Sequence, residues 1–320
     1  MKRISYPRPV SRSFKVAAVV SIAMAGLLFG AGQYGRTLRA SRALRELPST
    51  ARAVLRIDTR AVASTAAAAT LVEAFVPEER LSEIQTVCGL DPLTALREAT
   101  IWVRGTEDQP FQSIGLMLRG RTVDAAALAE CHRLLVEARG GSIVRLDGPS
   151  GAVLASRDRR SAIGVLDEHT IVTGSIETVS EALAVQRGTT AALGNRARIA
   201  ALWPRVNAGA SIAAAFDPPT HWKAAFERAA KLGDEASAMR GLQGIGLSVE
   251  SGSARTMHLY IDIDDAELAT DNAAVIKAWT AAPPESVQPP WTAVLQSARV
   301  QQVGRTVKVT LDVSSLEQSR

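Results

Sequence analysis

Apolar and polar residues alternate along many short stretches of the chain, and between these stretches the apolar residues recur at helical spacing. Alternation places successive side chains on opposite faces of a strand, whereas a three-to-four-residue recurrence marks one face of a helix. Short strands lying between helices indicate an α+β fold with mostly antiparallel sheets packed with helices. The clearest predicted strands are 53–57, 99–105 and 113–120, and the clearest predicted helices are 59–75, 123–139 and 176–188.

The same order of elements occurs twice. A joint at 188–195, "GTTAALGN", is followed by a second series of strand, helix, two strands and helix over 210–282. We therefore predict two α+β units, 48–190 and 191–320, that form a degenerate duplicated β-α-β-β-α arrangement. A helix is also predicted to begin at "GLDPLTALRE", where Asp91 caps and Pro92 occupies the first turn. Another is predicted to stop at Pro204.

The stretch 16–35, "VAAVVSIAMAGLLFGAGQYG", has no charged residue and lies between a basic segment, 1–15, and a basic stalk, 36–47. A membrane-spanning helix needs roughly 20 apolar residues, and this stretch has that length. Ala23-Met24-Ala25 resembles a cleavage site, so a removed signal peptide remains the alternative. We predict the helix, crossing the bacterial inner membrane once, with 1–15 in the cytoplasm and the body in the periplasm.

Gly26 and Gly30 have the small-xxx-small spacing that lets two membrane helices approach closely. This spacing is compatible with a homodimer formed through the membrane helix. It also arises by chance in a stretch so rich in Gly and Ala.

The positive charge belongs to the N-terminal arm. The net charge is +5, but residues 1–46 hold nine Lys and Arg against one acid, so the remaining chain is net negative by three. A basic arm beside an apolar helix suits anionic lipid headgroups, and the acidic body argues against nucleic-acid binding. The hydrophobic share of 47% and the charged share of 22% are typical of a folded globular body.

Cys88 and Cys131 are the two cysteines of the chain. In an exported protein such a pair is compatible with a disulfide, although Cys131 shares a helical stripe with Leu128 and Leu135, where ordinary buried cysteines also occur. Whether the two approach each other does not follow from the sequence. Their spacing matches no zinc motif.

Asp217 and His221 in "FDPPTHWK" are the strongest catalytic candidates, because a carboxylate four residues from an imidazole could orient it as a base. No nucleophile motif accompanies them, and Asp217 as a helix cap ahead of Pro218 is the favoured interpretation.

Asp262, Asp264 and Asp265 in "YIDIDDAELATD" resemble part of a calcium loop. An EF-hand loop requires Gly at its sixth position and Glu at its twelfth, where this chain has Glu267 and Ala273. We favour an exposed strand face followed by helix-capping acids over a metal site. The sequence calls for no cofactor.

Three segments carry a family resemblance: the opening "LP…AVLRID", the helix start "GLDPLTAL" and "LDEHTIVTGSIETVSEAL". Together with the N-terminal apolar stretch, the chain resembles a loose group of exported, membrane-anchored bacterial proteins of unknown function built from repeated α+β units. The resemblance implies a fold and a location and brings no catalytic residues with it.

These observations predict a membrane-tethered, non-catalytic envelope domain that acts by binding or scaffolding a protein partner. Two alternatives stay open: an envelope enzyme with dispersed active-site residues, and a carrier or sensor of apolar molecules.

Overall fold

A computed structural model of the chain describes residue 42 and residues 44–63, 78–109, 111–149, 151–208, 210–231, 239–250, 256–283, 287 and 291–314. The predicted membrane helix, its Gly26 and Gly30, segment 1–15 and most of the stalk fall outside these residues. Among the helices that are described, none combines the length and the apolar character needed to cross a bilayer.

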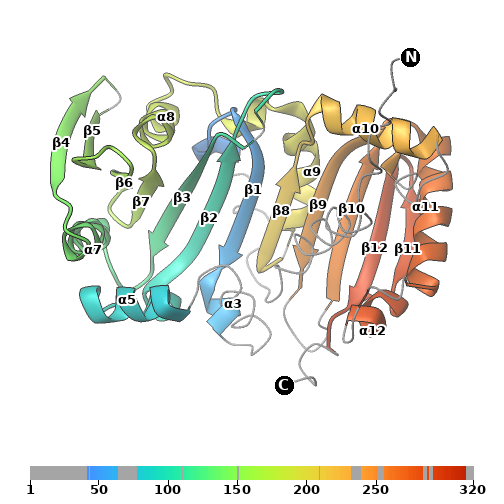
Figure 1. The fold of residues 1–320 in the computed structure, drawn as a ribbon, viewed down its shortest axis with the longest axis horizontal. Coiled ribbons are helices and arrows are strands. Elements are labelled where there is room, and N and C mark those ends of the chain that lie inside the picture. The colour runs from blue at the N-terminus through green and yellow to red at the C-terminus, as the bar shows by residue number, and fades with distance from the viewer. Residues whose placement is uncertain are drawn as a thin grey trace, which may run out of the picture.

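The described strands form one antiparallel sheet of twelve strands, and helices pack on it, as predicted for an α+β fold (Figure 1). The strand order is β11-β12-β10-β9-β8-β1-β2-β3-β7-β6-β5-β4.

The first half of the chain supplies seven of these strands. Its elements are β1 (Ala51–Asp58), α3 (Thr59–Ala63), α5 (Glu78–Cys88), α6 (Pro92–Ala95), β2 (Leu96–Arg104), β3 (Ser113–Gly120), α7 (Ala125–Ala138), β4 (Ile143–Gly148), β5 (Gly151–Ser156), β6 (Ala162–Asp167), β7 (Thr170–Gly174) and α8 (Ile176–Gln186).

The second half supplies the other five strands. Its elements are the 3-10 helix η1 (Leu193–Asn195), α9 (Ala197–Asn207), β8 (Ile212–Phe216), α10 (Thr220–Lys231), β9 (Leu242–Val249), β10 (Thr256–Ile263), α11 (Ala266–Ala281), α12 (Trp291–Gln296), β11 (Arg299–Val303) and β12 (Thr306–Asp312).

The first strands of the two halves, β1 and β8, lie side by side and make a seam in the middle of the sheet. They pair in antiparallel fashion from Ala53 opposite Phe216 to Ile57 opposite Ile212. From this seam β2 and β3 follow outward on one side, and β9 and β10 on the other. The two predicted units therefore share one continuous sheet.

Alternation along each strand builds a separate core on each face of the sheet. On one face Val54 and Trp102 pack with Leu202 and Trp203 of α9. On the other face Leu247 and Ile261 pack with Ile276 of α11. That second face also carries a smaller cluster under α7, formed by Leu96, Ala125, Leu128, Ile163 and Ile171.

Two predicted element boundaries are wrong. Helix α6 ends at Ala95, and β2 begins at Leu96 because residues 96–104 find pairing partners along β3. Helix α9 continues past Pro204 to Asn207, since Leu202, Trp203 and Val206 are all buried against the sheet. Packing of this apolar face offsets the backbone hydrogen bond that proline removes.

Candidate functional site

Asp217 lies at the end of β8 and is 4% exposed. Its Oδ2 accepts hydrogen bonds from Arg196 Nη2 at 2.6 Å and Nε at 3.0 Å, and its Oδ1 accepts one from Arg198 Nη1 at 3.1 Å. His221 is exposed on the first turn of α10, edge-on to the ring of Trp222. The carboxylate is therefore held by two arginines at the start of α9, which does not favour a role in orienting the imidazole.

The helix cap predicted for Asp217 is supplied by another residue. Glu107, in the loop between β2 and β3, accepts the backbone N–H of Thr220 on its Oε2 at 2.8 Å, at the first residue of α10. Its Oε1 is paired with Arg52 Nη2. Glu107 thus links the buried guanidinium of β1 to the positive end of α10.

Arg52 and Lys223 keep buried donors that have no partner among the described residues. The side chain of Arg52 is only 4% exposed; its Nε donates to the carbonyl of Gly105 at 3.4 Å and its Nη2 binds Glu107. Within the described part of the chain, Arg52 Nη1 and Lys223 Nζ are both buried without a hydrogen-bond partner.

Two pKa values in this region are lowered, for different reasons. Hydrogen bonds from Arg52 and from the backbone of Thr220 lower the pKa of Glu107 to about 2. Burial lowers the pKa of Lys223, and the positive charges of Arg198 and Arg52 act in the same direction. The carboxylates of Asp217 and Glu107 act against the lowering at Lys223 without cancelling it.

A second cluster of buried charges lies on the same face of the sheet. We call it the closed cluster, because its two arginines share the carboxylate of Glu98 as a counter-charge. Arg119 donates from Nη1 to Glu98 Oε1 at 3.2 Å, from Nη2 to Glu46 Oε2 at 3.0 Å and from Nε to Thr170 Oγ1 at 3.2 Å. Arg56 donates to Asn207 Oδ1 and to the carbonyl of Ala210, each at 2.8 Å, and its Nη1 lies 3.7 Å from Glu98 Oε2. Glu98 therefore sits between two buried arginines.

The three aspartates that resemble part of a calcium loop are separated by the fold. Asp262 Oδ1 accepts from Arg205 Nη1 at 3.0 Å and from Thr306 Oγ1 at 2.6 Å, whereas Asp265 caps α11 through the backbone N–H of Glu267 and Leu268. The backbone N–H of Asp264 donates to the carbonyl of Gly241. Among the described residues, no cluster of three metal-ligating side chains occurs.

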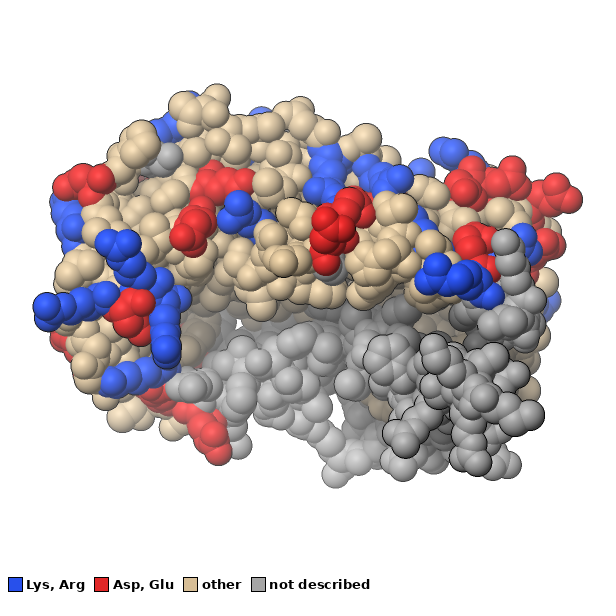
Figure 2. Space-filling view, turned by 45° about the horizontal axis from the view of Figure 1, so that its top comes forward, with Lys and Arg blue, Asp and Glu red and all other residues tan. Residues whose placement is uncertain are grey.

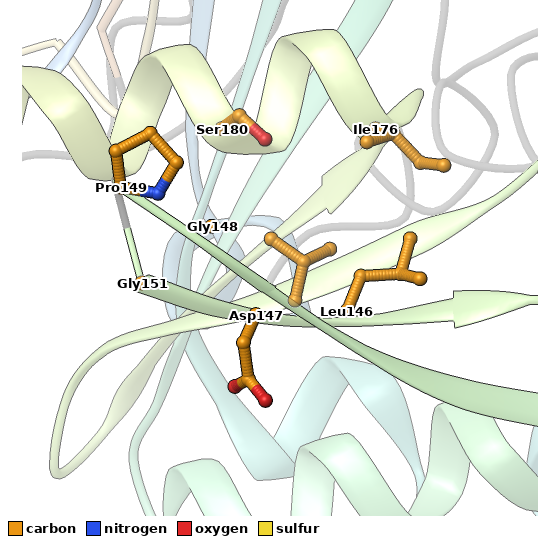
Figure 3. A pocket seen from close by; sticks show the side chains of 8 residues that line it. Leu146, Asp147, Gly148, Pro149, Gly151, Ile176 and Ser180 are labelled. Atoms are coloured by element: carbon orange, nitrogen blue, oxygen red, sulfur yellow. The ribbon is translucent and has the colours of Figure 1, made fainter.

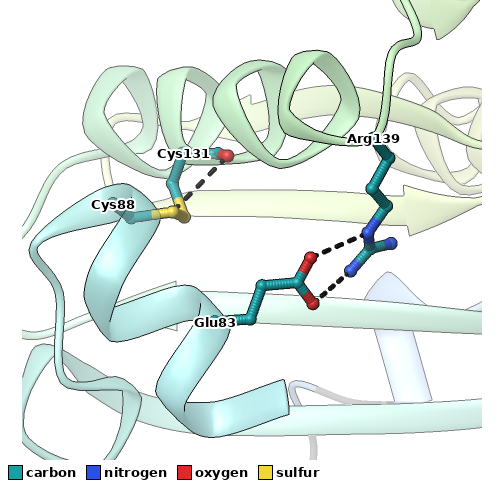
Figure 4. Close-up of a disulfide and its surroundings, with 4 residues drawn as sticks. All are labelled: Glu83, Cys88, Cys131 and Arg139. Atoms are coloured by element: carbon teal, nitrogen blue, oxygen red, sulfur yellow. Dashed lines mark hydrogen bonds and ion pairs between the residues drawn. A yellow bond between two sulfur atoms is a disulfide. The ribbon is translucent and has the colours of Figure 1, made fainter. Parts of the chain in front are cut away.

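Cys88 at the end of α5 and Cys131 of α7 are joined by a disulfide, with their Cα atoms 5.0 Å apart (Figure 4). The same two helices are held by Arg139, which donates to both carboxylate oxygens of Glu83 at 2.9 and 2.7 Å. The structure therefore contains the disulfide that the sequence left open. It fastens α5 to α7, the helix that covers β6 and β7.

Apolar side chains form a row across four strands at the end of the seam. Phe216, Ala53, Val103 and Ile114 are neighbours in register on the face that also carries α7 and α11. The next row on this face consists of Ala214, Leu55, Ile101 and Leu116. Ile114 is 62% exposed.

An aromatic cluster continues this apolar surface. Phe111, in the loop between β2 and β3, is 58% exposed and stacks on Phe216 with ring centroids 6.4 Å apart. Trp222 lies 5.9 Å from Phe111 and 5.6 Å from Phe216. Three segments thus fix the position of an exposed phenyl ring.

A hollow of about 260 Å³ lies at the far end of the sheet, between the β4–β5 hairpin and α8 (Figure 3). Apolar side chains of Leu146, Val153 and Ile176 line it, together with Ser180, while the carboxylate of Asp147 points away from α8 (Figure 3). Its volume is slightly below the range typical of small-molecule pockets.

The charge cluster at Arg52 was missed by the sequence analysis, although one signal for it exists. In "ARAVLRID" Arg52, Val54 and Arg56 alternate onto one face of the strand. Charged residues in register with buried apolar ones predict buried ion pairs. Their partners come from distant segments and leave no local pattern.

The fold and these clusters define an α+β protein built on one large antiparallel sheet, with buried arginine clusters on one face and an apolar surface on the other. No family model and no curated protein matches the chain. Crystal structures of TP0453 are similar to it: crystal form III at a TM-score of 0.47 and 11% identity, over 86% of this chain and 96% of that chain, and crystal form IV at 0.45 and 10%, over 87% and 95%.

Proposed function

We propose that this protein is a membrane-tethered domain of the bacterial envelope that acts by binding a protein partner, with its body in the periplasm. The apolar stretch 16–35 would provide the tether, as expected from the sequence. The observation that carries the binding role is the apolar surface formed by Phe111, Ile114 and the row of residues across the seam.

Surfaces of this kind support binding because removing apolar and aromatic side chains from water is favourable, at about 25 cal/mol per Å². Phe111 is held by two aromatic neighbours, so little conformational freedom would be lost when a partner covers it. Aromatic anchors of this type dominate the energetics of many protein interfaces. The adjacent carboxylate of Glu107, whose side chain is 52% exposed, would supply part of a polar rim.

The test is photo-crosslinking in intact cells. A photoreactive residue at position 111 or 114 of the full-length protein should give a discrete cross-linked protein band. The same residue at Val303, which is 68% exposed on edge strand β11, provides the matched control. Equal labelling at all three positions, or labelling at none of them, would contradict a protein-binding role for this surface.

A carrier of apolar molecules is the second candidate, favoured by the hollow beside α8. Ile176→Trp would fill this hollow without touching the seam. Loss of bound fluorescent fatty acid in this variant, with the cross-link at position 111 intact, would favour the carrier.

We also propose that the sheet descends from a duplicated β-α-β-β-α unit. The outward order β1-β2-β3 and β8-β9-β10 on the two sides of the seam supports this proposal. The resemblance to exported proteins built from repeated units accords with it.

A further inference from the structure

We infer that Arg52 and Lys223 form a subsite for a phosphate group at the end of the β1–β8 seam. The inference is independent of the proposed function, because it uses neither Phe111 nor the apolar rows. It rests on two buried donors for which the described part of the chain provides no acceptor: Nη1 of Arg52 and Nζ of Lys223.

We assign both donors to one region, because Glu107 connects the elements that carry them and the charges of Arg52, Glu107 and Asp217 all act on Lys223. One carboxylate oxygen of Glu107 pairs with Arg52, and the other accepts the N–H of Thr220, one helical turn before Lys223. Asp217 completes the connection, since its N–H donates to the carbonyl of Arg52 at 2.8 Å while its carboxylate holds Arg196 and Arg198.

The charge of the site favours a dianion. Four cationic side chains, Arg52, Arg196, Arg198 and Lys223, meet two carboxylates, Asp217 and Glu107, so two positive charges are unbalanced. A phosphate monoester carries about −1.5 to −2 charges near neutral pH and three strong acceptor oxygens. Buried polar groups are nearly always hydrogen-bonded, and an open buried donor next to excess charge commonly marks an ion site.

Access to the site is from the edge of the sheet that is uppermost in Figure 1. Figure 2, in which this edge comes forward, shows Lys and Arg side chains beside Asp and Glu side chains along it. The side chain of Glu107 is 52% exposed. Outward rotation of this loop carboxylate would give an incoming phosphate access to Arg52 and Lys223.

The experiment is calorimetric titration of the full-length protein in detergent micelles with two ligands. Inorganic phosphate tests a free anion, and dihexanoyl phosphatidic acid tests the same group on a lipid. Lys223→Gln should weaken binding about tenfold or more, because it removes a charge-assisted hydrogen bond. Lys223→Arg should retain most of the affinity, and Glu107→Gln should tighten binding by removing the competing carboxylate.

Lys277→Gln, on the exposed side of α11, is the matched control and should bind as the wild type does. Saturable binding of inorganic phosphate that depends on Lys223 assigns a free phosphate. Such binding of the lipid alone assigns a lipid headgroup. Binding of neither ligand, or equal affinities for the wild type and Lys223→Gln, overturns the inference and leaves the two donors hydrated.

Discussion

Strand β1 buries an arginine near each of its ends, and the two side chains differ in how their guanidinium nitrogens are paired. Arg52 and Arg56 lie on one face of this strand, four residues apart, and are 3% and 2% exposed. At Arg56, Nε and Nη2 donate hydrogen bonds to Asn207 and to Ala210, and Nη1 lies 3.7 Å from Glu98 Oε2, which is ion-pair distance and too long for a hydrogen bond. At Arg52 one nitrogen and the nearby ammonium of Lys223 lack acceptors among the described residues.

This difference teaches that burial of a charge does not by itself indicate its role. In the closed cluster, hydrogen bonds and ion pairs offset the free-energy cost of removing the charges from water. They also fix the positions of the strands that carry these charges. The cluster of Arg52 and Lys223, here called the open cluster, keeps desolvated donors whose free-energy cost is not offset by hydrogen bonds. A ligand of opposite charge would lower that cost. Removing a charged side chain should therefore lower the free energy of unfolding at the closed cluster and raise it at the open cluster.

The largest effect is expected from the disulfide between Cys88 and Cys131, which fastens α5 to α7 (Figure 1). Replacing both cysteines by serine should lower the free energy of unfolding by about 4 kcal/mol, because the unfolded chain is no longer constrained. Urea unfolding with and without reductant measures the loss. A double variant as stable as the oxidised wild type would show that the cross-link does not form.

Removal of the shared acid of the closed cluster comes next. Glu98→Gln should lower the free energy of unfolding by about 3 kcal/mol, because Arg119 and Arg56 would both lose a buried counter-charge. Glu130→Gln breaks an exposed ion pair with Arg133 and should change the free energy of unfolding far less, because solvent screens the pair. Similar losses for the two variants in chemical denaturation would remove the distinction between closed and surface clusters.

Removal of a cation from the open cluster should stabilise the protein, in contrast to removal of Glu98. Lys223→Met should raise the free energy of unfolding by about 1 kcal/mol in phosphate-free buffer at pH 7, because it removes a buried ammonium without an acceptor. The folded-state pKa of Lys223 is lowered, so the charged form is penalised below that pKa and the penalty fades as pH rises toward the unfolded value of 10.5. The gain should therefore shrink in alkaline buffer. Destabilisation by this variant at pH 7 would mean that Lys223 is satisfied.

The smallest effect concerns Glu107. Its pKa is lowered to about 2 in the folded protein from a usual value of 4.5, so its contribution to stability is present above pH 4.5 and is lost as the pH falls toward 2. The melting temperatures of the wild type and Glu107→Gln should differ at pH 6 and converge near pH 2. Because the side chain is 52% exposed, we expect a small difference. A difference that stays constant over this range would exclude the ion pair with Arg52 as its source.

Local patterns predicted most elements of the fold but not all of their boundaries. Strands β1 and β3 and helices α7, α8, α10 and α11 follow from alternation or helical spacing. Helix α9 violates the local signal at Pro204, because three buried side chains on its apolar face outweigh one lost hydrogen bond. Strands gain their register from partners that are distant in sequence, so the early start of β2 could not be predicted locally.

The candidate site residues also divide into those with contacts between near neighbours, which could be predicted, and those with contacts between distant segments, which could not. Asp265 caps α11, an interaction between near neighbours that the sequence predicted. Asp217 was expected to cap α10, but its carboxylate meets Arg196 and Arg198, and the cap comes from Glu107, more than one hundred residues before Thr220. Spacing along a chain predicts contacts within a turn or a helix and no others.

The sequence by itself determined the α+β class of the body, the helical and extended segments, and the concentration of positive charge in the N-terminal arm. These properties depend on composition and on periods of two to four residues. Only the tertiary structure decided that the two halves share one sheet, that Arg56 is ion-paired with Glu98, and that Arg52 acts electrostatically on Lys223 while each keeps a donor without an acceptor among the described residues. Each of these depends on segments far apart in the sequence, and their proximity is set by the packing of the whole sheet.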